Sequence, residues 1–529
     1  MRKVFVTIVV VCCVFGTLIA DTYVGRVDTI GGTTHDWQLN GPAVRVLCNS
    51  PEYGVYALWM HSAEEAPFND RNMRLNFYYY QTRSWVWIDP DFMGSGINVY
   101  TERSGFGNLA VEPGSGEWIA VTHQRSSGQA YHSVLAHQSL GFCPGPDSFY
   151  QPVVAVGKNG WIHIAMTDQW SAERVFYSRC TTWCNWTEPI LIGEPGDINY
   201  NITASLVSDK VAIVWVKSIL GGGSMDSLFY RYSTNGGTSW SEPILLLPPP
   251  TFGGDTATSF CEWGPFPYYD KNDRLHIVVP VMPVVNSNRQ TNPAAIWHWC
   301  ETNFPQWSLV HRAGCARENL KGSPGYYATY ACRPSIGEGS RGVLYVTWEQ
   351  FDSLNVEPVT NRLRAGIWLT SSTDNGETWL SPLRLTPIDS VSHRFPCIID
   401  QMVSGGPETD TVVVLYMIDS IAGFYAVWYE GPMSRNPIVC QCVAQMVGIE
   451  DSTTPAANSS RETATIVRST LFLSPRLSAV SHKPVLLLDI SGRKVLELKS
   501  GANDLRHLAP GVYFIKDGSA IERKAVITK

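Results

Sequence analysis

A short motif recurs along this chain and constrains its fold more than any other feature. Residues 176–190, 230–244 and 369–383 each begin with a β-prone run and end in a tryptophan, two further residues, a proline and an aliphatic residue. The second and third segments share the tighter spacing S-x-[DN]-x-G-x-x-W. The residues that carry this spacing are Ser233, Asn235, Gly237 and Trp240 in one copy, and Ser372, Asp374, Gly376 and Trp379 in the other.

The spacing predicts a tight hairpin turn. An Asp or Asn side chain accepts hydrogen bonds from backbone N–H groups just after it, and glycine adopts the positive φ that other residues resist. The tryptophan then opens the returning strand and buries its ring against a neighbouring sheet. In segment 176–190 the glycine is missing and Cys180 and Cys184 bracket the turn, so we expect a local disulfide to replace the turn chemistry there.

Each turn belongs to a longer unit. A β-prone apolar run precedes the three turns, at residues 161–165, 211–216 and 343–348. Weaker runs of the same kind occur at Val55–Trp59, Trp118–Thr122, Leu275–Val279 and Thr411–Tyr416. Together they indicate about seven units of roughly 45–70 residues, which is the length of a four-stranded propeller blade. An array of β-sandwiches is the alternative to an all-β propeller, and both six and seven blades remain open.

Composition narrows the function classes. The chain of 529 residues has 19 Trp, 23 Tyr, 44 Gly and 33 Pro, a mixture that favours short strands joined by many turns. Its formal net charge of −7 and the lack of a long basic run argue against a nucleic-acid partner. The glycine-rich stretch 221–225 has no lysine after it, and no zinc or calcium spacing is present, so we expect no cofactor and no metal.

The two tight turns resemble the Asp-box, or BNR repeat, of sialidases and related β-propellers. This resemblance implies a six- or seven-bladed sialidase-like propeller over residues 21–446. It also implies that each box lies on the turn between the third and fourth strands of a blade, away from the central pocket. The Asp-box marks an element of the fold, and it does not identify an active site.

The N-terminus predicts export. Residues 1–20 combine Arg2 and Lys3, an apolar run and a small residue at Ala20, as in a cleaved secretory signal peptide. We therefore expect no membrane span in the mature chain. Of the 13 cysteines, Cys12 and Cys13 lie in this segment, which leaves 11 beyond it. Besides Cys180 with Cys184, we expect Cys300 and Cys315 to be a disulfide pair.

A compositional change near residue 448 predicts a separate module. Residues 447–465 read as a polar linker, and residues 466–529 as a small β-sandwich. The stretches LLDISGRKV at 487–495 and LAPGVYFIK at 508–516, with the basic last strand, resemble the type A sorting domain of the type IX secretion system. The residues that carry this motif are Asp489, Gly492, Arg493, Gly511 and Tyr513. The resemblance implies Sec export to the periplasm, recognition by the type IX machinery, and delivery to the cell surface or the medium.

The activity of the propeller is less constrained. An exo-sialidase needs three arginines, a Tyr–Glu pair and an Asp, and Arg45, Arg333, Arg394 and Tyr429-Glu430 are the nearest counterparts here. The [FY]-R-I-P motif of the first arginine is absent, so we assign no catalytic residue. We expect a glycan- or protein-binding propeller, whose pocket aromatics would come from stretches such as 262–266 and 297–299. A divergent sialidase-like glycoside hydrolase and a structural adhesion component are the alternatives.

Overall fold

The computed structural model describes two compact units, Met1–Gly448 and Ile449–Lys529. The residues described are 22–125, 130–168, 174–217, 226–249, 257–261, 263–286, 288–404, 410–444, 464–467, 470–473, 485–489, 493–499, 501–517 and 520–527. The predicted signal peptide and nearly all of the predicted linker lie outside these residues. The helical segments within them are far too short to cross a bilayer.

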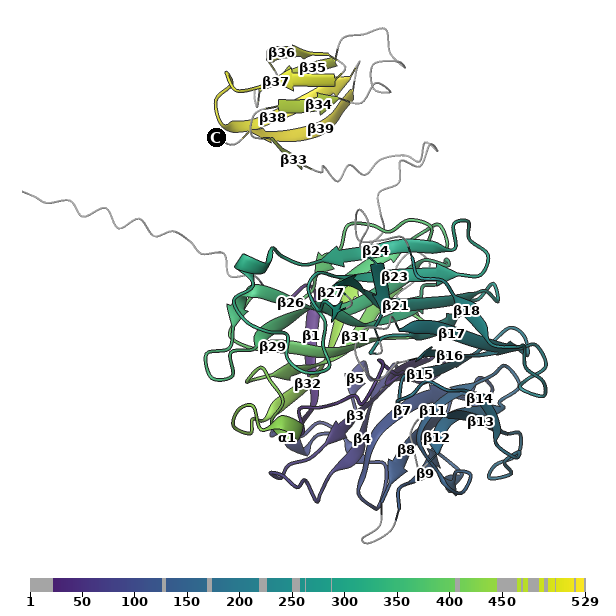
Figure 1. Cartoon of the computed structure of the whole chain (residues 1–529). Coiled ribbons are helices and arrows are strands. Elements are labelled where there is room, and N and C mark those ends of the chain that lie inside the picture. The colour runs from purple at the N-terminus through teal and green to yellow at the C-terminus, as the bar shows by residue number, and fades with distance from the viewer. Residues whose placement is uncertain are drawn as a thin grey trace, which may run out of the picture. The chain divides into compact units, whose positions relative to one another are not determined.

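The first unit is a β-propeller of seven sheets in its described residues (Figure 1). The innermost strands of successive sheets contact one another, in the order β2, β7, β11, β15, β20, β25 and β29, so these strands surround the axis. Blade 1 contains β2 (Leu47–Ser50), β3 (Gly54–His61), β4 (Asn72–Tyr79), β5 (Ser84–Trp85) and β6 (Ile97–Asn98). Blade 2 contains β7 (Ser104–Val111), β8 (Trp118–Gln124), β9 (His132–His137) and β10 (Gly141–Pro144). Blade 3 contains β11 (Phe149–Val156), β12 (Ile162–Asp168), β13 (Val175–Cys180) and β14 (Ile190–Gly193). Blade 4 contains β15 (Tyr200–Ala204), β16 (Val211–Lys217), β17 (Ser227–Ser233) and β18 (Ile244–Leu246).

The remaining three blades complete the ring. Blade 5 contains β19 (Ala257–Phe260), β20 (Phe266–Tyr269), β21 (Leu275–Val285), β22 (Asn288–Arg289), β23 (Ala294–Cys300) and β24 (Trp307–Ala313). Blade 6 contains β25 (Ala331–Glu338), β26 (Leu344–Val356), β27 (Leu363–Ser372) and β28 (Leu383–Arg384). Blade 7 contains β29 (Ser392–Ile398), β30 (Val403–Ser404), β31 (Asp410–Asp419), β32 (Asn436–Ala444) and β1 (Arg26–Thr33). Short helical segments are η1 (Phe92–Gly94), η2 (Arg317–Asn319) and α1 (Tyr425–Trp428).

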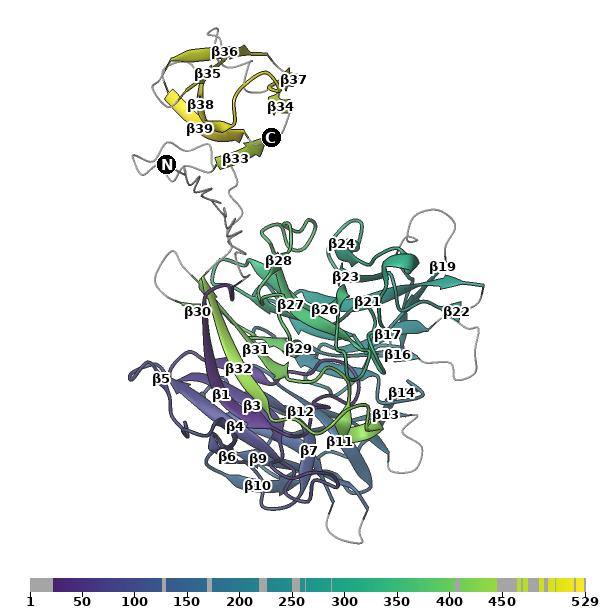
Figure 2. The same ribbon diagram turned by 90° about the vertical axis from the view of Figure 1, so that its left-hand side faces the viewer.

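The ring is closed by its two ends. The N-terminal strand β1 pairs antiparallel with β32, from Arg26 opposite Cys442 to Thr33 opposite Asn436 (Figure 2). Blade 7 therefore takes its outermost strand from the start of the chain and its other strands from the end of the unit. This pairing makes the whole ring depend on contacts between distant parts of the sequence.

The second strands form the core of each blade. Every residue of β3 and β12 is buried, because each sheet packs between two neighbouring sheets. A strand covered on both faces needs a nearly continuous apolar run, and all seven runs predicted from the sequence lie in second strands. The sequence thereby predicted the all-β propeller, and the structure decides between six and seven blades in favour of seven.

The first strands begin with bulges. The register shifts at the start of β7, β11, β25 and β29. A residue with positive φ stands in each bulge, namely Phe106, Gln151, Arg333 and Phe395. Such conformations cost about 1–3 kcal/mol each and cluster at functional sites. We call the end of the propeller where the first strands begin the entry face, and the opposite end the exit face.

The segment between β1 and β2 fills the axis. Arg45 donates hydrogen bonds to the carbonyls of Ile398 (2.7 Å) and Ile336 (2.9 Å) on blades 7 and 6. Its guanidinium also lies 4.8 Å from the ring centre of Phe266 on blade 5. The Ala43 carbonyl accepts a 2.8 Å hydrogen bond from Asn201 on blade 4. Ligand access to the propeller is therefore from its two faces, since this segment crosses the middle.

The second unit is also built of strands. One sheet has the order β33 (Ala464–Val467), β39 (Ala520–Ile527), β38 (Gly511–Asp517), β35 (Val485–Leu488) and β36 (Lys494–Leu498). The other pairs β34 (Thr470–Leu473) with β37 (Gly501–Asp504). The apolar core gathers Leu487, Leu498, Leu505 and Ile515.

Candidate functional site

The entry face carries a continuous cluster of aromatic rings. Trp37 lies 5.7 Å from Tyr327, with the rings stacked, and 5.6 Å from Phe106, with the rings edge to face. Trp263 lies 5.6 Å from Tyr327, with the rings edge to face. The ring centre of Phe106 lies 5.6 Å from that of His123. The cluster thus extends from blade 5 across the axis to blade 2, and its partly exposed rings offer flat apolar surfaces.

Two tyrosines continue this cluster toward blade 3. Tyr131, from the β8–β9 loop, lies 4.9 Å from His123 and is stacked on Tyr150 at 6.1 Å. Both tyrosines are partly exposed, whereas His123 is buried. Burial and the charges of nearby arginines lower the pKa of His123 to about 3, so its imidazole is neutral at physiological pH.

Three arginines converge on the same place. Arg71, just before β4, is buried, donates a 3.1 Å hydrogen bond to the Ser104 carbonyl, and has its guanidinium 5.5 Å from the ring centre of Phe106. Arg103 donates to the Phe68 carbonyl at 3.0 Å. Arg125 is exposed and lies 5.2 Å from the ring centre of Tyr131. Gly105 permits this packing, because a Cβ there would come within 2.9 Å of Arg71 Nε.

These arginines change the acidity of Tyr131. Partial burial raises the pKa of its phenol, but a hydrogen bond from Arg125 and the charges of Arg71 and Arg103 outweigh burial and lower the pKa below its usual value. By contrast, burial and the charges of Asp197 and Asp168 raise the pKa of Tyr150. The two stacked phenols therefore differ in chemistry, and only Tyr131 is biased toward the phenolate.

The arrangement suits an anionic sugar. Aromatic faces stack on the apolar faces of pyranose rings, and guanidinium groups bind carboxylates or sulfates with two parallel hydrogen bonds. Neutral His35 and His123 add imidazole groups without adding charge, because burial lowers the pKa of each to about 3. We call the set Arg71, Arg103, Arg125, His123 and Tyr131 the entry-face site.

Known proteins resemble this chain in structure at low sequence identity. No protein-family model matches the chain, and no curated protein matches it. Among solved structures, an ulvan lyase of polysaccharide lyase family PL25 is 11% identical, with a TM-score of 0.47, over 80% of this chain and 98% of that chain. The polysaccharide lyase Uly1 is 12% identical, with a TM-score of 0.46, over 80% of this chain and 99% of that chain. A Hadza microbial sialidase is 15% identical, with a TM-score of 0.31, over 70% of this chain and 73% of that chain.

The arginines considered for a sialidase-like site have other partners. Arg333 and Arg394 do converge, but both are buried and both bind Glu349, at 2.5 Å and 3.2 Å. Arg45 lies in the axial segment, where it joins three blades. Arg333 and Arg394 are buried and Arg45 is only partly exposed, and all three guanidinium groups contribute to the packing between blades.

The other residues considered from sequence are dispersed. Tyr429 is exposed, and Glu430 forms an ion pair with Arg362. Residues 297–299 belong to β23, where His298 and Trp299 are buried against neighbouring blades. From residues 262–266, Trp263 does reach the entry-face aromatic cluster, whereas Phe266 lies beside the axial Arg45.

The two predicted hairpin turns lie on the rim, between the third and fourth strands of blades 4 and 6. Ser233 Oγ accepts from the Gly237 N–H, and Ser372 Oγ accepts from the Gly376 N–H, both at 2.8 Å. Asp374 and Asn235 each accept a 2.9 Å hydrogen bond from the N–H four residues on. Each turn also contacts the blade before it, because Trp240 packs on Tyr177 at 4.7 Å and Trp379 on His298 at 5.3 Å.

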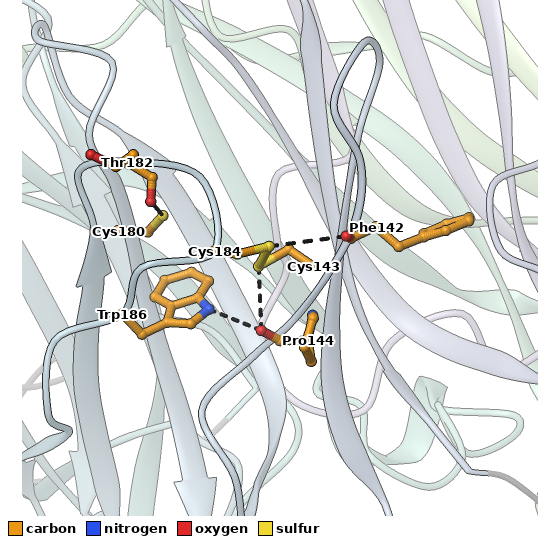
Figure 3. The surroundings of a disulfide bond; sticks show 7 residues. All are labelled: Phe142, Cys143, Pro144, Cys180, Thr182, Cys184 and Trp186. Atoms are coloured by element: carbon orange, nitrogen blue, oxygen red, sulfur yellow. Dashed lines mark hydrogen bonds between the residues drawn. A yellow bond between two sulfur atoms is a disulfide. The ribbon is translucent and has the colours of Figure 1, made fainter.

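The disulfide prediction was wrong in its partner. Cys184 bonds to Cys143 on β10 of the preceding blade, while Cys180, Cys300 and Cys315 are free (Figure 3). The Sγ of Cys180 lies 2.7 Å from the Thr182 carbonyl, and Trp186 Nε1 donates to the Pro144 carbonyl at 2.9 Å. The turn after β13 is thus joined to blade 2 by the disulfide and by Trp186. The turns of blades 4 and 6 instead contact the preceding blade through their glycine and tryptophan residues.

The structure places four of the five sorting-motif residues in the second unit. Arg493 binds Asp489 through its backbone N–H (3.0 Å) and its Nε (3.1 Å), which closes the β35–β36 turn. Tyr513 is buried, and its hydroxyl donates to the Ala509 carbonyl at 2.9 Å. Gly511 begins β38, and Gly492 lies outside the described residues.

One group in the described residues has metal-ligand chemistry. Glu112, Glu117 and His137 gather at the exit-face end of blade 2. His137 Nδ1, however, accepts hydrogen bonds from the N–H groups of Ser139 (3.1 Å) and Leu140 (3.4 Å). In the neutral imidazole the proton then sits on Nε2, so neither ring nitrogen offers a free lone pair to a cation.

Sequence reasoning missed the entry-face site. Its residues come from the β3–β4 loop, the start of β7 and the β8–β9 loop, and no single stretch combines them. A weaker signal was present, because three of the four bulge residues precede a proline, at Pro152, Pro334 and Pro396. The repeated X-Pro pair at the start of a unit marks the bulge with which the first strand of that blade begins.

Proposed function

We propose that this protein is an exported propeller that binds an acidic glycan at its entry face. The observation that carries the proposal is the convergence of Arg71, Arg103 and Arg125 around Tyr131, beside a row of partly exposed aromatic rings. A carboxylated or sulfated sugar would meet both features at once. A neutral glycan would leave the guanidinium groups without an anionic ligand.

Affinity electrophoresis tests this function. A protein comprising residues 21–446 is run in gels that contain polygalacturonate, chondroitin sulfate or neutral dextran. The two acidic polysaccharides should slow its migration, and dextran should not. The double variant Arg103→Gln, Arg125→Gln should bind at least roughly tenfold more weakly, because each charge-assisted hydrogen bond contributes about 1.5–3 kcal/mol. Arg83→Gln is the control, since Arg83 is an exposed arginine on the β4–β5 turn at the exit face. Equal loss in the control, or equal retardation by dextran, would contradict the proposal.

The lowered pKa of Tyr131 favours a second candidate, cleavage of a uronate-containing glycan by β-elimination. The Tyr131 phenolate would take the proton on the carbon next to the carboxylate, which an arginine neutralises. The C–H electrons form a C=C bond, the bond to the leaving glycosidic oxygen breaks, and that oxygen takes up a proton. This elimination requires no cofactor.

Catalysis is tested by the near-ultraviolet absorbance of the unsaturated uronate product. Tyr131→Phe should abolish product formation and leave glycan binding within about twofold. Activity should rise as the pH rises through the lowered pKa of Tyr131, because the phenolate is the base. Product formation by Tyr131→Phe at the wild-type rate would leave only the binding function.

We do not favour a sialidase, because Arg333 and Arg394 are buried and bound to Glu349, and Tyr429 is exposed at the surface. The purified propeller should release no sialic acid from a fluorogenic sialoside. Robust release would restore the hydrolase alternative.

We also propose that residues 447–529 carry a type IX secretion address. The support is the sequence resemblance together with an Asp489–Arg493 turn and a buried Tyr513 in a separate β-unit. Fused to a reporter with a signal peptide, this segment should carry the reporter across the outer membrane of a host with that system. Surface delivery of a chain truncated at residue 446, at full efficiency, would contradict the assignment.

A further inference from the structure

A cavity lies at the exit face, on the opposite side of the axial segment from the entry-face site. Its volume is about 480 Å³, and residues at the exit-face ends of five blades line it. Blade 1 contributes Asn49 and Tyr80, blade 4 Leu206 and Val207, and blade 6 Glu338. Leu206 and Val207 are 45% and 50% exposed, so the cavity is open to solvent on that side.

Glu338 gives this cavity a specific chemistry. The residue is 5% exposed, and its Oε2 accepts a 2.8 Å hydrogen bond from the Lys271 N–H. Among the residues that the structure describes, no hydrogen-bond donor reaches its Oε1. A buried carboxylate oxygen without a donor is costly, so this atom calls for a donor from outside the chain.

The charges around Glu338 limit what that donor can be. Lys271 Nζ lies 3.9 Å from Glu338 Oε1 and is itself held by the Ser340 carbonyl at 2.6 Å. A cationic ligand would be repelled by Lys271, and an anionic ligand by Glu338. The balance favours an uncharged ligand whose hydroxyl groups donate to the carboxylate and accept from the ammonium group.

The remaining lining suits the same ligand. Tyr80 and Tyr268 are fixed by their hydroxyls, which donate to Asn49 Oδ1 (2.6 Å) and to the Asp400 carbonyl (3.2 Å). Rings held in this way can contact the apolar faces of a sugar without further loss of rotamer freedom. The volume of the cavity is in the range of small-ligand sites.

We propose that the exit-face cavity binds a neutral saccharide, with one sugar hydroxyl donating to Glu338 Oε1. This site is separate from the anionic-glycan site of the proposed function, and it stands if that function fails. A propeller with both sites would hold a charged glycan at one face and an uncharged sugar unit at the other.

The test is a calorimetric and ligand-observed NMR titration of residues 21–446 with cellobiose, maltose and chitobiose. At least one of these should bind with millimolar affinity or better. Glu338→Gln should weaken it at least tenfold, because the Lys271 N–H holds the amide oxygen at the Oε2 position and leaves an NH₂ donor at the Oε1 position, where an acceptor is needed. Exposed Glu377→Gln on the blade 6 rim is the matched control and should change nothing.

A second variant keeps the test decisive if Glu338→Gln does not fold. Val207→Trp fills the exposed mouth without touching the carboxylate and should abolish saccharide binding while leaving retardation by acidic polysaccharides intact. The proposal is overturned if none of the three saccharides binds at millimolar concentration. It is also overturned if 1,4-diaminobutane binds more tightly than they do and loses affinity in Glu338→Gln.

Discussion

Glu349 on β26 is the residue on which the packing of blades 6 and 7 depends most. Its carboxylate binds two buried arginines, Arg333 of β25 and Arg394 of β29, and it also accepts a 2.8 Å hydrogen bond from the Phe395 N–H. Burial raises its pKa, but the charges of Arg394 and Arg333 outweigh burial and lower the pKa to about 2. Both bulges at this side of the entry face are therefore held by one carboxylate.

Glu349→Gln should lower the free energy of unfolding by about 3–5 kcal/mol, because it removes the carboxylate that binds both buried guanidinium groups. The stability that Glu349 contributes is present above its unfolded pKa of about 4.3 and is lost as the pH falls through its folded pKa of about 2. Denaturant unfolding at pH 7 and pH 2.5 measures both effects, with Glu377→Gln as the control. A loss at pH 7 below about 1 kcal/mol would show that the pair of arginines needs no carboxylate.

The hairpin turns act as contacts between neighbouring blades. Gly376 has φ +78°, and a Cβ there would come 2.2 Å from the His298 imidazole on blade 5. Gly237 has φ +80°, and a Cβ there would come 1.7 Å from the Tyr177 hydroxyl on blade 3. Each glycine is thus required by the backbone and by the preceding blade together.

Asp374→Ala should destabilise the propeller by about 1–3 kcal/mol through lost turn hydrogen bonds, and Gly376→Val by at least as much through strain and the clash with His298. Neither should alter glycan binding by the folded protein. Thermal unfolding and affinity electrophoresis measure the two properties. Unchanged melting with lost binding would instead place this turn in a ligand site.

The Cys143–Cys184 bond performs the same inter-blade role in blade 3. It encloses a sequence separation of 41 residues, so Cys184→Ser should cost about 2–4 kcal/mol. Peptide mapping without reductant should recover a peptide pair that joins residues 143 and 184. A peptide that contains a bond between Cys180 and Cys184 would contradict the Cys143–Cys184 pairing and would support the local disulfide expected from the sequence.

At the scale of the whole molecule, the sequence predicted the fold better than the site. Continuous apolar runs such as 211–216 reveal second strands because sheets cover both of their faces. The entry-face site has no such signal, since Arg71, Arg103 and Tyr131 come from three separate segments that the packing of blade 1 against blade 2 brings together. The pairing of Cys184 was missed for the same reason, because its partner lies on another blade.

Hydrogen–deuterium exchange of residues 21–446 with and without an acidic polysaccharide tests whether the glycan binds at the entry face. We expect the glycan to slow exchange in the entry-face residues 62–71, 103–106, 123–125 and 130–132, and to leave the exit-face turns 80–83, 112–117 and 270–274 unchanged. Protection should disappear in the Arg103→Gln, Arg125→Gln variant. Protection of the exit-face turns instead would contradict binding at the entry face. The absence of any protection in a protein whose migration the same polysaccharide slows in a gel would also contradict it.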